Sequence, residues 1–237
     1  MDILILATSA KNSGYCVAGL DLESNRLIRL VSDDEISNFA LSKRDITYNN
    51  GSICKALDVV SIDNLVYSPT DRQHENYKID NSNYPVFQYK GFIDENIYNF
   101  LNKRNIIEQQ TYTFMGSRKH FLYEDEMNNF GKSLAVYFAN KIEIYQENNK
   151  SKADIFINEN IYTKISVTDF DYFYEEDKTL TNVLLVCSLP DKPWDKLGPN
   201  MYFKFIAKII EINDLENIHK IPDRHLYGGR PPYGCHR

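Results

Sequence analysis

Glycine and proline are scarce in this sequence, which has 10 glycines and 8 prolines in 237 residues. This scarcity argues against long disordered linkers. The four cysteines are widely spaced and include no CxxC pair, and we expect a protein with reduced thiols. Cys16 and Cys187 lie in apolar, strand-like runs and are predicted to be buried free thiols.

A basic excess is absent as well. The formal net charge is −6, and it is uneven. Residues 1–100 carry 9 Lys or Arg against 14 Asp or Glu, whereas residues 101–237 carry 18 against 19. This balance argues against a protein that binds duplex DNA in bulk. A nucleic-acid site would have to be a local groove, and the second half is the better place for it.

Long apolar runs are also missing. The N-terminal segment 1–14 has an acidic start, and its apolar stretch is too short for a signal peptide or a membrane span. We therefore expect a cytoplasmic protein that has no membrane partner.

Signatures of catalysis are equally scarce. The sequence contains no GxSxG, HExxH or Walker motif. No histidines recur at metal-ligand spacing, and His225, Cys235 and His236 in the tail are too isolated to define a zinc site. We expect no catalytic activity, no metal and no cofactor.

What the sequence does have is aromatic side chains, with 17 Tyr and 13 Phe, which favour strands. Short apolar runs separated by turns predict a β-meander at the start of the chain. Strands are expected over 3–9, 15–22, 26–32 and 56–66. Ser32 and Glu35 fit a capping box, which predicts a short helix over 33–40. An ordered loop is expected over 67–76.

The second half predicts another set of strands. Asp94 is expected to cap a helix over 95–104. After a boundary region over 105–133, we expect a strand over 133–146, a hairpin over 153–169, a short helix over 170–177, and strands over 182–190 and 201–210. In the second hairpin strand, strict alternation places Ile161 and Ile165 on one face and Tyr162 on the other.

Three strands, a short helix and two more strands are the order of an OB-fold, a small barrel with a helix at one end. The first half repeats this order more loosely. The predicted fold is therefore mostly β with short helices, as two OB-like small β-barrels packed in one compact unit. We expect the first barrel over 1–110, the second over 111–212 and a C-terminal tail over 213–237.

Several segments, taken in order, resemble one known family. They are YCVAGLDLESNRLIRLVSDDE, LDVVSI, QHEN, YTKISVTD, VLLVCSLPDKPW and YFKFIAKII. In this order and spacing they resemble the dual OB-containing domain family of bacterial proteins over roughly residues 1–212. The resemblance implies two OB-like barrels and a nucleic-acid-binding role in bacterial defence systems. The sequence departs from the family at the third strand, where Leu27 and Leu30 replace an aromatic residue and a proline.

The segment MYFKFIAKII at 201–210 is the main candidate for a binding surface. Its odd positions are apolar, and Tyr202, Lys204 and Lys208 are expected on the opposite, solvent-facing side. OB-folds that hold single strands stack bases on aromatic rings and contact phosphates with lysines. Trp194, in the proline-bounded loop just before, would add another ring. The alternative is that Trp194 closes the barrel end and the lysines only face solvent.

Arg29 lies on a strand face that it shares with Leu27 and Val31, and a charge in this apolar setting needs a partner. Arg29 would either clamp a phosphate or carboxylate of a ligand, or pair with Asp21, Asp58 or another acid inside the fold. The second interpretation is favoured, and Arg29 stays the nucleic-acid-binding candidate of the first barrel.

Three further segments are candidates for contacts. Lys11 lies in the turn TSAKNSG, which could hold an anion although its spacing is not that of a P-loop. The side chains of the loop over 72–76 would contact a base or a small polar ligand, or would only hold this long loop in place by hydrogen bonds within the protein. Its hydrogen-bonding side chains are Arg72, Gln73, His74, Glu75 and Asn76. SRKHF at 117–121 is the most basic local cluster and would suit an electrostatic contact with nucleic acid, although a solvated helix face is the favoured interpretation.

Together these features favour a protein that binds single-stranded nucleic acid or a nucleotide-like ligand without catalysis. Two alternatives stay open. One is a docking module for a partner enzyme encoded nearby, with the acidic first half as its interface. The other is a metal-dependent nuclease, because Glu176 and Lys178 form an ExK-like fragment with Asp154 upstream.

Overall fold

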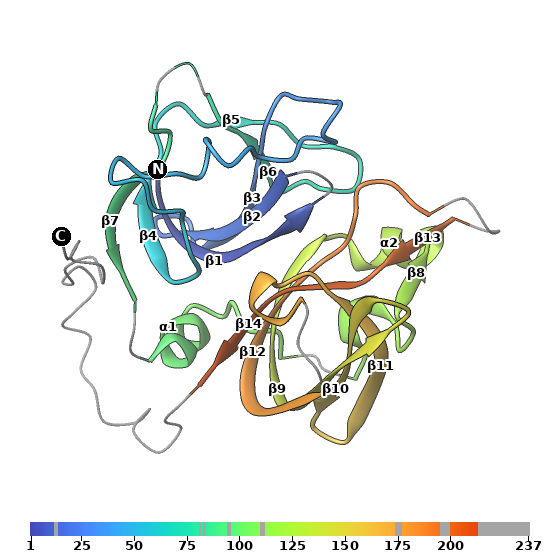
Figure 1. The fold of residues 1–237 in the computed structure, drawn as a ribbon. Coiled ribbons are helices and arrows are strands. Elements are labelled where there is room, and N and C mark those ends of the chain that lie inside the picture. The colour runs from blue at the N-terminus through green and yellow to red at the C-terminus, as the bar shows by residue number, and fades with distance from the viewer. Residues whose placement is uncertain are drawn as a thin grey trace.

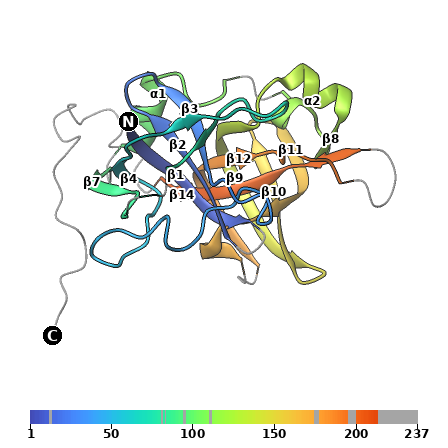
Figure 2. The ribbon, with the colours of Figure 1, turned by 90° about the horizontal axis from the view of Figure 1, so that it is seen from above.

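The computed structural model describes residues 1–11, 14–80, 82, 84–93, 96–109, 112–173, 177–194 and 200–212 (Figure 1). The protein is mostly β, with two curled β units that lie side by side. Figure 2 shows the same pair from above, with β7 (Gln88–Phe92) toward one end and β8 (Phe121–Tyr123) toward the other.

The first unit is a seven-stranded sheet with the strand order β5-β6-β3-β2-β1-β4-β7. The strands other than β7 are β1 (Asp2–Lys11), β2 (Gly14–Asp21), β3 (Arg26–Val31), β4 (Asp58–Ser61), β5 (Val66–Tyr67) and β6 (Asn76–Lys78). In an OB-fold the third strand pairs in parallel with the fifth, and the first pairs with the fourth. Since β3 pairs in parallel with β6, and β1 pairs with β4, these strands follow the OB order. β5 and β7 occupy the two outer edges.

The second unit is a closed barrel with the order β10-β11-β14-β12-β9. Its strands are β9 (Leu134–Glu147), β10 (Lys150–Ile157), β11 (Asn160–Val167), β12 (Lys178–Ser188) and β14 (Phe205–Glu211). β11 and β14 pair in parallel, and β9 pairs with both β10 and β12, which is again the OB order. The predicted fold class of two OB-like barrels is therefore confirmed. Of the helix predicted over 170–177, the structure shows the short 3₁₀-helix η2 (Phe170–Tyr172).

Residues 93–133 connect the two units. They carry α1 (Ile97–Lys103), the 3₁₀-helix η1 (Phe114–Gly116), β8 and α2 (Glu124–Phe130). The predicted cap Asp94 lies outside the described residues, and Asn96 is the N-cap residue of α1. Within the described ranges, no helix is long and apolar enough to cross a membrane. A barrel boundary at residue 110 stays a prediction.

The segment 33–40 is not the helix that the pattern beginning at Ser32 predicts, and it forms turns instead. Asn38 and Phe39 have positive φ angles of 56° and 62°, which a right-handed helix excludes. The Ser32 hydroxyl donates a hydrogen bond to the Ala40 carbonyl and so closes this turn.

Strand β11 does not alternate as its sequence predicts. Tyr162 and Ile165 are both buried, whereas Ile161 is 57% exposed. The register with β10 shifts at this point, and Lys164 has a φ of 61°. This bulge adds one residue to β11, so Tyr162 and Ile165 both point inward although they are three positions apart. The Lys164 side chain is left in solvent.

The two units share an apolar core in addition to the cluster inside each of them. Leu4 and Leu6 of β1 lie in the same buried cluster as Val136 of β9 and Leu184 of β12. The face of β1 and β2 that points away from the core of the first unit is therefore covered by the second barrel. A nucleic-acid surface of the usual OB kind is thus better sought on the second barrel.

Candidate nucleic-acid interface

A two-stranded ribbon lies beside the second barrel, where both views place it next to β11 (Figures 1 and 2). It pairs β8 with β13 (Met201–Phe203), and Leu122 lies opposite Tyr202. The predicted direction of alternation is wrong here: Tyr202 is 3% exposed and Lys204 is fully buried. The physical reason is that Leu122 and Tyr202 pack into the apolar cluster that fills the barrel, so the even positions face inward.

Lys204 is the most deeply buried charged residue of the ribbon segment. Its ammonium donates hydrogen bonds to the Phe114 carbonyl at 2.5 Å, to the Ser117 carbonyl at 2.7 Å and to the Ser117 hydroxyl at 3.3 Å. Burial lowers the pKa of Lys204 to about 7, although the nearby Glu126 carboxylate acts in the opposite direction. These contacts hold the ammonium inside the fold, away from the position of a bound phosphate.

The Lys204 pKa predicts a pH-dependent stability. An unfolded chain, with an ordinary lysine pKa, binds more protons than the folded protein between about pH 7 and pH 10. The free energy of unfolding should therefore rise with pH in this interval, relative to a Lys204→Met variant, by about 1.4 kcal/mol per pH unit. Urea denaturation of both proteins at several pH values measures this difference. Parallel pH profiles for the two proteins would contradict the prediction.

Lys208, on β14, is held by two carboxylates. Its ammonium lies 3.0 Å from the Asp169 carboxylate and also contacts Asp171. Asp169 is 1% exposed and accepts a further hydrogen bond from the Ile209 amide. Lys208 therefore stabilises the turn around η2, and the predicted role in phosphate binding has no support in this geometry.

The outer face of the ribbon carries an aromatic cluster, here called the aromatic ribbon. It consists of His120, Phe121, Tyr123, Trp194 and Phe203. The Phe203 ring centroid lies 5.8 Å from that of His120, 6.0 Å from that of Phe121 and 6.4 Å from that of Trp194. The Trp194 amide donates to the Met201 carbonyl at 2.7 Å, and its side chain is 44% exposed. These rings form a continuous surface that solvent reaches.

Cationic side chains border the aromatic ribbon. Arg118 and Lys119 are exposed, and the Lys119 ammonium lies 4.4 Å from the Tyr123 ring centroid. Partial burial lowers the pKa of His120, and the positive charges of Lys152 and Lys164 lower it further. The Lys164 charge is partly balanced by Glu147, at 2.7 Å. Among the charges that act on the His120 pKa, lysines therefore outnumber carboxylates.

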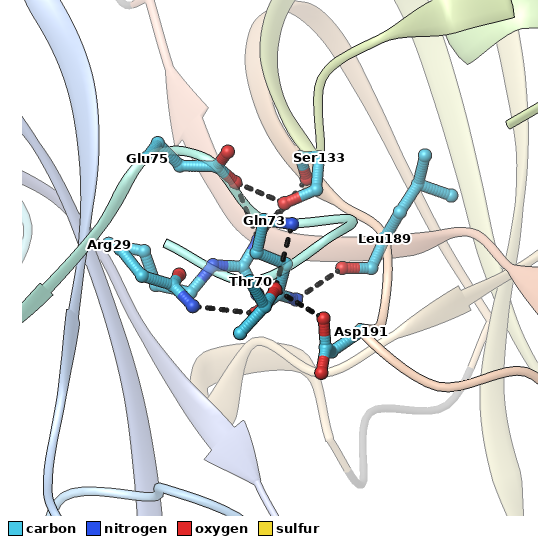
Figure 3. Close-up of polar contacts among 8 residues, drawn as sticks. Arg29, Thr70, Gln73, Glu75, Ser133, Leu189 and Asp191 are labelled. Atoms are coloured by element: carbon cyan, nitrogen blue, oxygen red, sulfur yellow. Dashed lines mark hydrogen bonds and ion pairs between the residues drawn. The ribbon is translucent and has the colours of Figure 1, made fainter. Parts of the chain in front are cut away.

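Arg29 lies at the contact between the two units (Figure 3). It is 3% exposed, and its Nη2 atom lies 3.3 Å from the Glu75 carboxylate, 2.8 Å from the Ser133 hydroxyl and 3.2 Å from the Ser133 carbonyl. Arg29 thus forms a buried ion pair, with Glu75 as its partner in place of Asp21 or Asp58. The Arg29 guanidinium therefore bonds to groups at the junction of the two units and is not presented to a ligand in solvent.

The strand order and the paired units agree with a comparison of the sequence with known families. The model of the dual OB-containing domain family matches residues 1–209. The chain belongs to this family. No curated protein matches it at a significant level.

Two solved structures are similar to this dual OB-containing protein. One is described as a murine DNA-binding protein bound with double-stranded DNA; it has 7% identity and a TM-score of 0.33, with 90% of this chain and 95% of the other covered. The second is the Ifi202 HINa domain in complex with a 20-base-pair DNA duplex. It is 9% identical in sequence, with a TM-score of 0.32, and the match covers 90% of this chain and 96% of the other. Similarity at this level carries no conclusion about the function of the dual OB-containing protein.

The loop over 68–75, between β5 and β6, links the first unit of the dual OB-containing protein to the second (Figure 3). The Gln73 side chain donates to the Leu189 carbonyl at 3.0 Å, and the Thr70 hydroxyl donates to the Asp191 carboxylate at 2.5 Å. The Gln73 side-chain oxygen also accepts a hydrogen bond from the Asn76 side-chain amide at 3.3 Å. Of the two roles that the sequence left open for this loop, these contacts favour the structural one for Gln73 and Asn76.

Arg72 and Lys11 have different surroundings. The Arg72 guanidinium contacts Asn128 and lies 2.7 Å from the Glu124 carboxylate, on α2 of the second unit. Lys11 is half-buried at the end of β1. Burial lowers the pKa of the Lys11 ammonium, and the nearby Arg29 charge lowers it further. A ligand-binding role for either residue stays a prediction.

The described residues lend little support to the alternative of a metal-dependent nuclease. Glu176 and the tail residues lie outside the described residues. Asp154 accepts hydrogen bonds from the Tyr145 hydroxyl and the Lys164 amide, both at 2.9 Å. Across the described ranges, no three His, Cys, Asp or Glu side chains gather in a way that could hold a metal ion.

Sequence reasoning overlooked most of the aromatic ribbon. SRKHF is not a helix face; it is a turn that leads into β8. The signal for this was present in FLY at 121–123, where Leu122 stands between two aromatic residues as in a strand with one buried face. Phe203 stands at one of the apolar odd positions of its segment, and apolarity alone does not show that this ring lies in the outer cluster.

Proposed function

We propose that this protein binds single-stranded nucleic acid on its second barrel. The observation that carries the proposal is the aromatic ribbon, in which exposed and half-buried rings lie beside Arg118 and Lys119. Lys152 of β10 and Lys164 of β11 lie close enough for their charges to act on His120. Aromatic rings stack bases without regard to sequence, and cations follow the phosphates. The arrangement brings both kinds of contact to one surface.

The location of the ribbon supports the same function. OB-folds bind oligonucleotides on the face of their second and third strands and on the loop between the fourth and fifth. In the second barrel these strands are β10 and β11, and the loop between β12 and β14 carries Trp194 and β13. Analogy of fold alone would be a weak reason; here the side chains at that place have the required chemistry.

An unpaired strand suits this surface better than a duplex. The rings of the aromatic ribbon need access to base faces, which are buried in stacked base pairs. The net charge of −6 also disfavours tight binding to the dense charge of duplex DNA. The proposal includes a cytoplasmic site of action, and a role in bacterial defence that rests on the family resemblance alone.

A salt titration tests the proposal. Fluorescence anisotropy of labelled DNA and RNA strands of roughly 15 nucleotides, about the upper limit for one OB-fold, should show binding that weakens as salt rises. Replacing Arg118 and Lys119 with alanine should reduce the slope of log affinity against log salt by about 1.4, because each lost phosphate contact contributes about 0.7 for single strands.

The matched control removes the same charge from the first unit. Lys43→Ala with Lys90→Ala changes two exposed lysines of that unit and should leave the salt slope unchanged. If both double variants lower the slope equally, binding is non-specific attraction and not a site at the ribbon. Absence of binding at low salt would reject the proposal and favour a docking module.

A further inference from the structure

A second candidate site lies away from the aromatic ribbon, in a cleft between the two units. The cleft has a volume of about 770 Å³. It is bordered by the start of β3, the β5–β6 hairpin, residues 105–108 and the start of β9. Small-molecule sites commonly have volumes of roughly 300–1,000 Å³. The space is therefore of a size that holds one small ligand.

Most charges around the cleft are already paired. Glu75 accepts from Arg29 and Ser133, and Glu108 is bound by Lys132. Arg26, which is exposed at the first position of β3, has no hydrogen bond or ion pair with any described residue. The uncommitted charge of the cleft is thus a guanidinium, a group suited to bidentate contact with phosphate or carboxylate.

Two tyrosines form an aromatic wall of the cleft. The ring centroids of Tyr67 and Tyr77 are 5.3 Å apart, and both residues line the cavity. Tyr67 is 58% exposed even though it lies on a strand, because β5 is an edge strand of only two residues. The pairing of β5 with β6 fixes the backbone at Tyr67, and the exposed Tyr67 ring can stack with a planar partner. Asn25 and Asn105 add amide groups to the lining.

We propose that this cleft binds a nucleoside monophosphate, as a free nucleotide or as the end of a strand. The heterocycle stacks on Tyr67, and the phosphate binds the Arg26 guanidinium. The asparagine amides offer donors and acceptors to the edge of the base. The site shares no residue with the aromatic ribbon. This proposal can therefore be tested, and rejected, separately from the function proposed for that surface.

Calorimetric titration of the full-length protein with AMP and with adenosine tests this assignment. AMP should bind saturably and about tenfold or more tightly than adenosine, because only AMP engages Arg26. Arg26→Gln should remove this preference and leave adenosine binding unchanged. Tyr67→Ala should weaken both ligands by at least about fivefold, as loss of one stacking ring does.

Two further arms make the outcome decisive. Phe203→Ala, in the aromatic ribbon, should leave AMP affinity unchanged. A 5′-phosphorylated dinucleotide that binds much more tightly than AMP, with the same loss in Arg26→Gln, would identify a strand end as the occupant. The proposal is overturned if AMP gives no saturable binding at millimolar concentration, or if the wild-type preference for AMP persists in Arg26→Gln.

Discussion

Loss of both Trp194 and Phe203 should weaken binding of a single-stranded oligonucleotide by at least about 30-fold, since each stacking ring contributes about 1–3 kcal/mol. The two rings are neighbours in the aromatic ribbon, with centroids 6.4 Å apart. Their removal leaves the backbone pairing of Trp194 with Met201 in place, so the ribbon keeps its hydrogen bonds. Anisotropy titration of Trp194→Ala/Phe203→Ala at one fixed salt concentration measures the effect.

This loss should differ in kind from the loss caused by removing cations. Rings contact bases and not phosphates, so the salt dependence of the double variant should match that of the wild-type protein. Phe170→Ala is the matched control, because Phe170 is 47% exposed and packs against Tyr15, away from the ribbon. Affinity of the ribbon variant within threefold of wild type would show that bases do not stack there.

Replacing Glu75 with alanine should lower the free energy of unfolding by about 3–5 kcal/mol. Among the described residues, the variant leaves the buried Arg29 guanidinium with Ser133 alone as a polar partner, and an uncompensated buried charge is costly. The Ser133 hydroxyl also loses its contact with the carboxylate. Urea denaturation of the variant and the wild-type protein gives the difference directly.

An ion pair from the same loop supplies the control. Glu124 pairs with Arg72 across the same junction, but its side chain is 52% exposed. Glu124→Ala should therefore cost less than about 1 kcal/mol. Exchanging the buried pair for apolar residues, as Arg29→Met with Glu75→Leu, should recover most of the lost stability. Equal costs for Glu75→Ala and Glu124→Ala would mean that Arg29 is not a buried charge in solution.

The order of the elements followed from the sequence because alternation and turns are local signals. The strand predicted over 133–146 is β9, displaced by one residue, and both OB orders could be predicted from the succession of strands. The failure over 33–40 is also local, since two positive φ angles end a helix that the capping pattern favours.

The candidate site was harder to predict because it depends on contacts between distant residues. Alternation divides a strand into two faces without saying which of them is inside. Lys204 faces inward because the carbonyls of Phe114 and Ser117, about 90 residues away in the chain, accept its hydrogen bonds. The partner of Arg29 could not be predicted from local sequence either, because Glu75 lies in a loop 46 residues away in the chain.

The apolar cluster between the two units has a consequence for how such a chain can change over time. Each of Leu4, Val136 and Leu184 contributes to a layer that neither sheet completes alone. We therefore expect the two barrels to unfold together as one cooperative unit and not as two independent domains. A substitution in this layer should change the stability of both barrels at once. None of the residues of the aromatic ribbon belongs to this layer, so we expect the ribbon to tolerate substitution more freely.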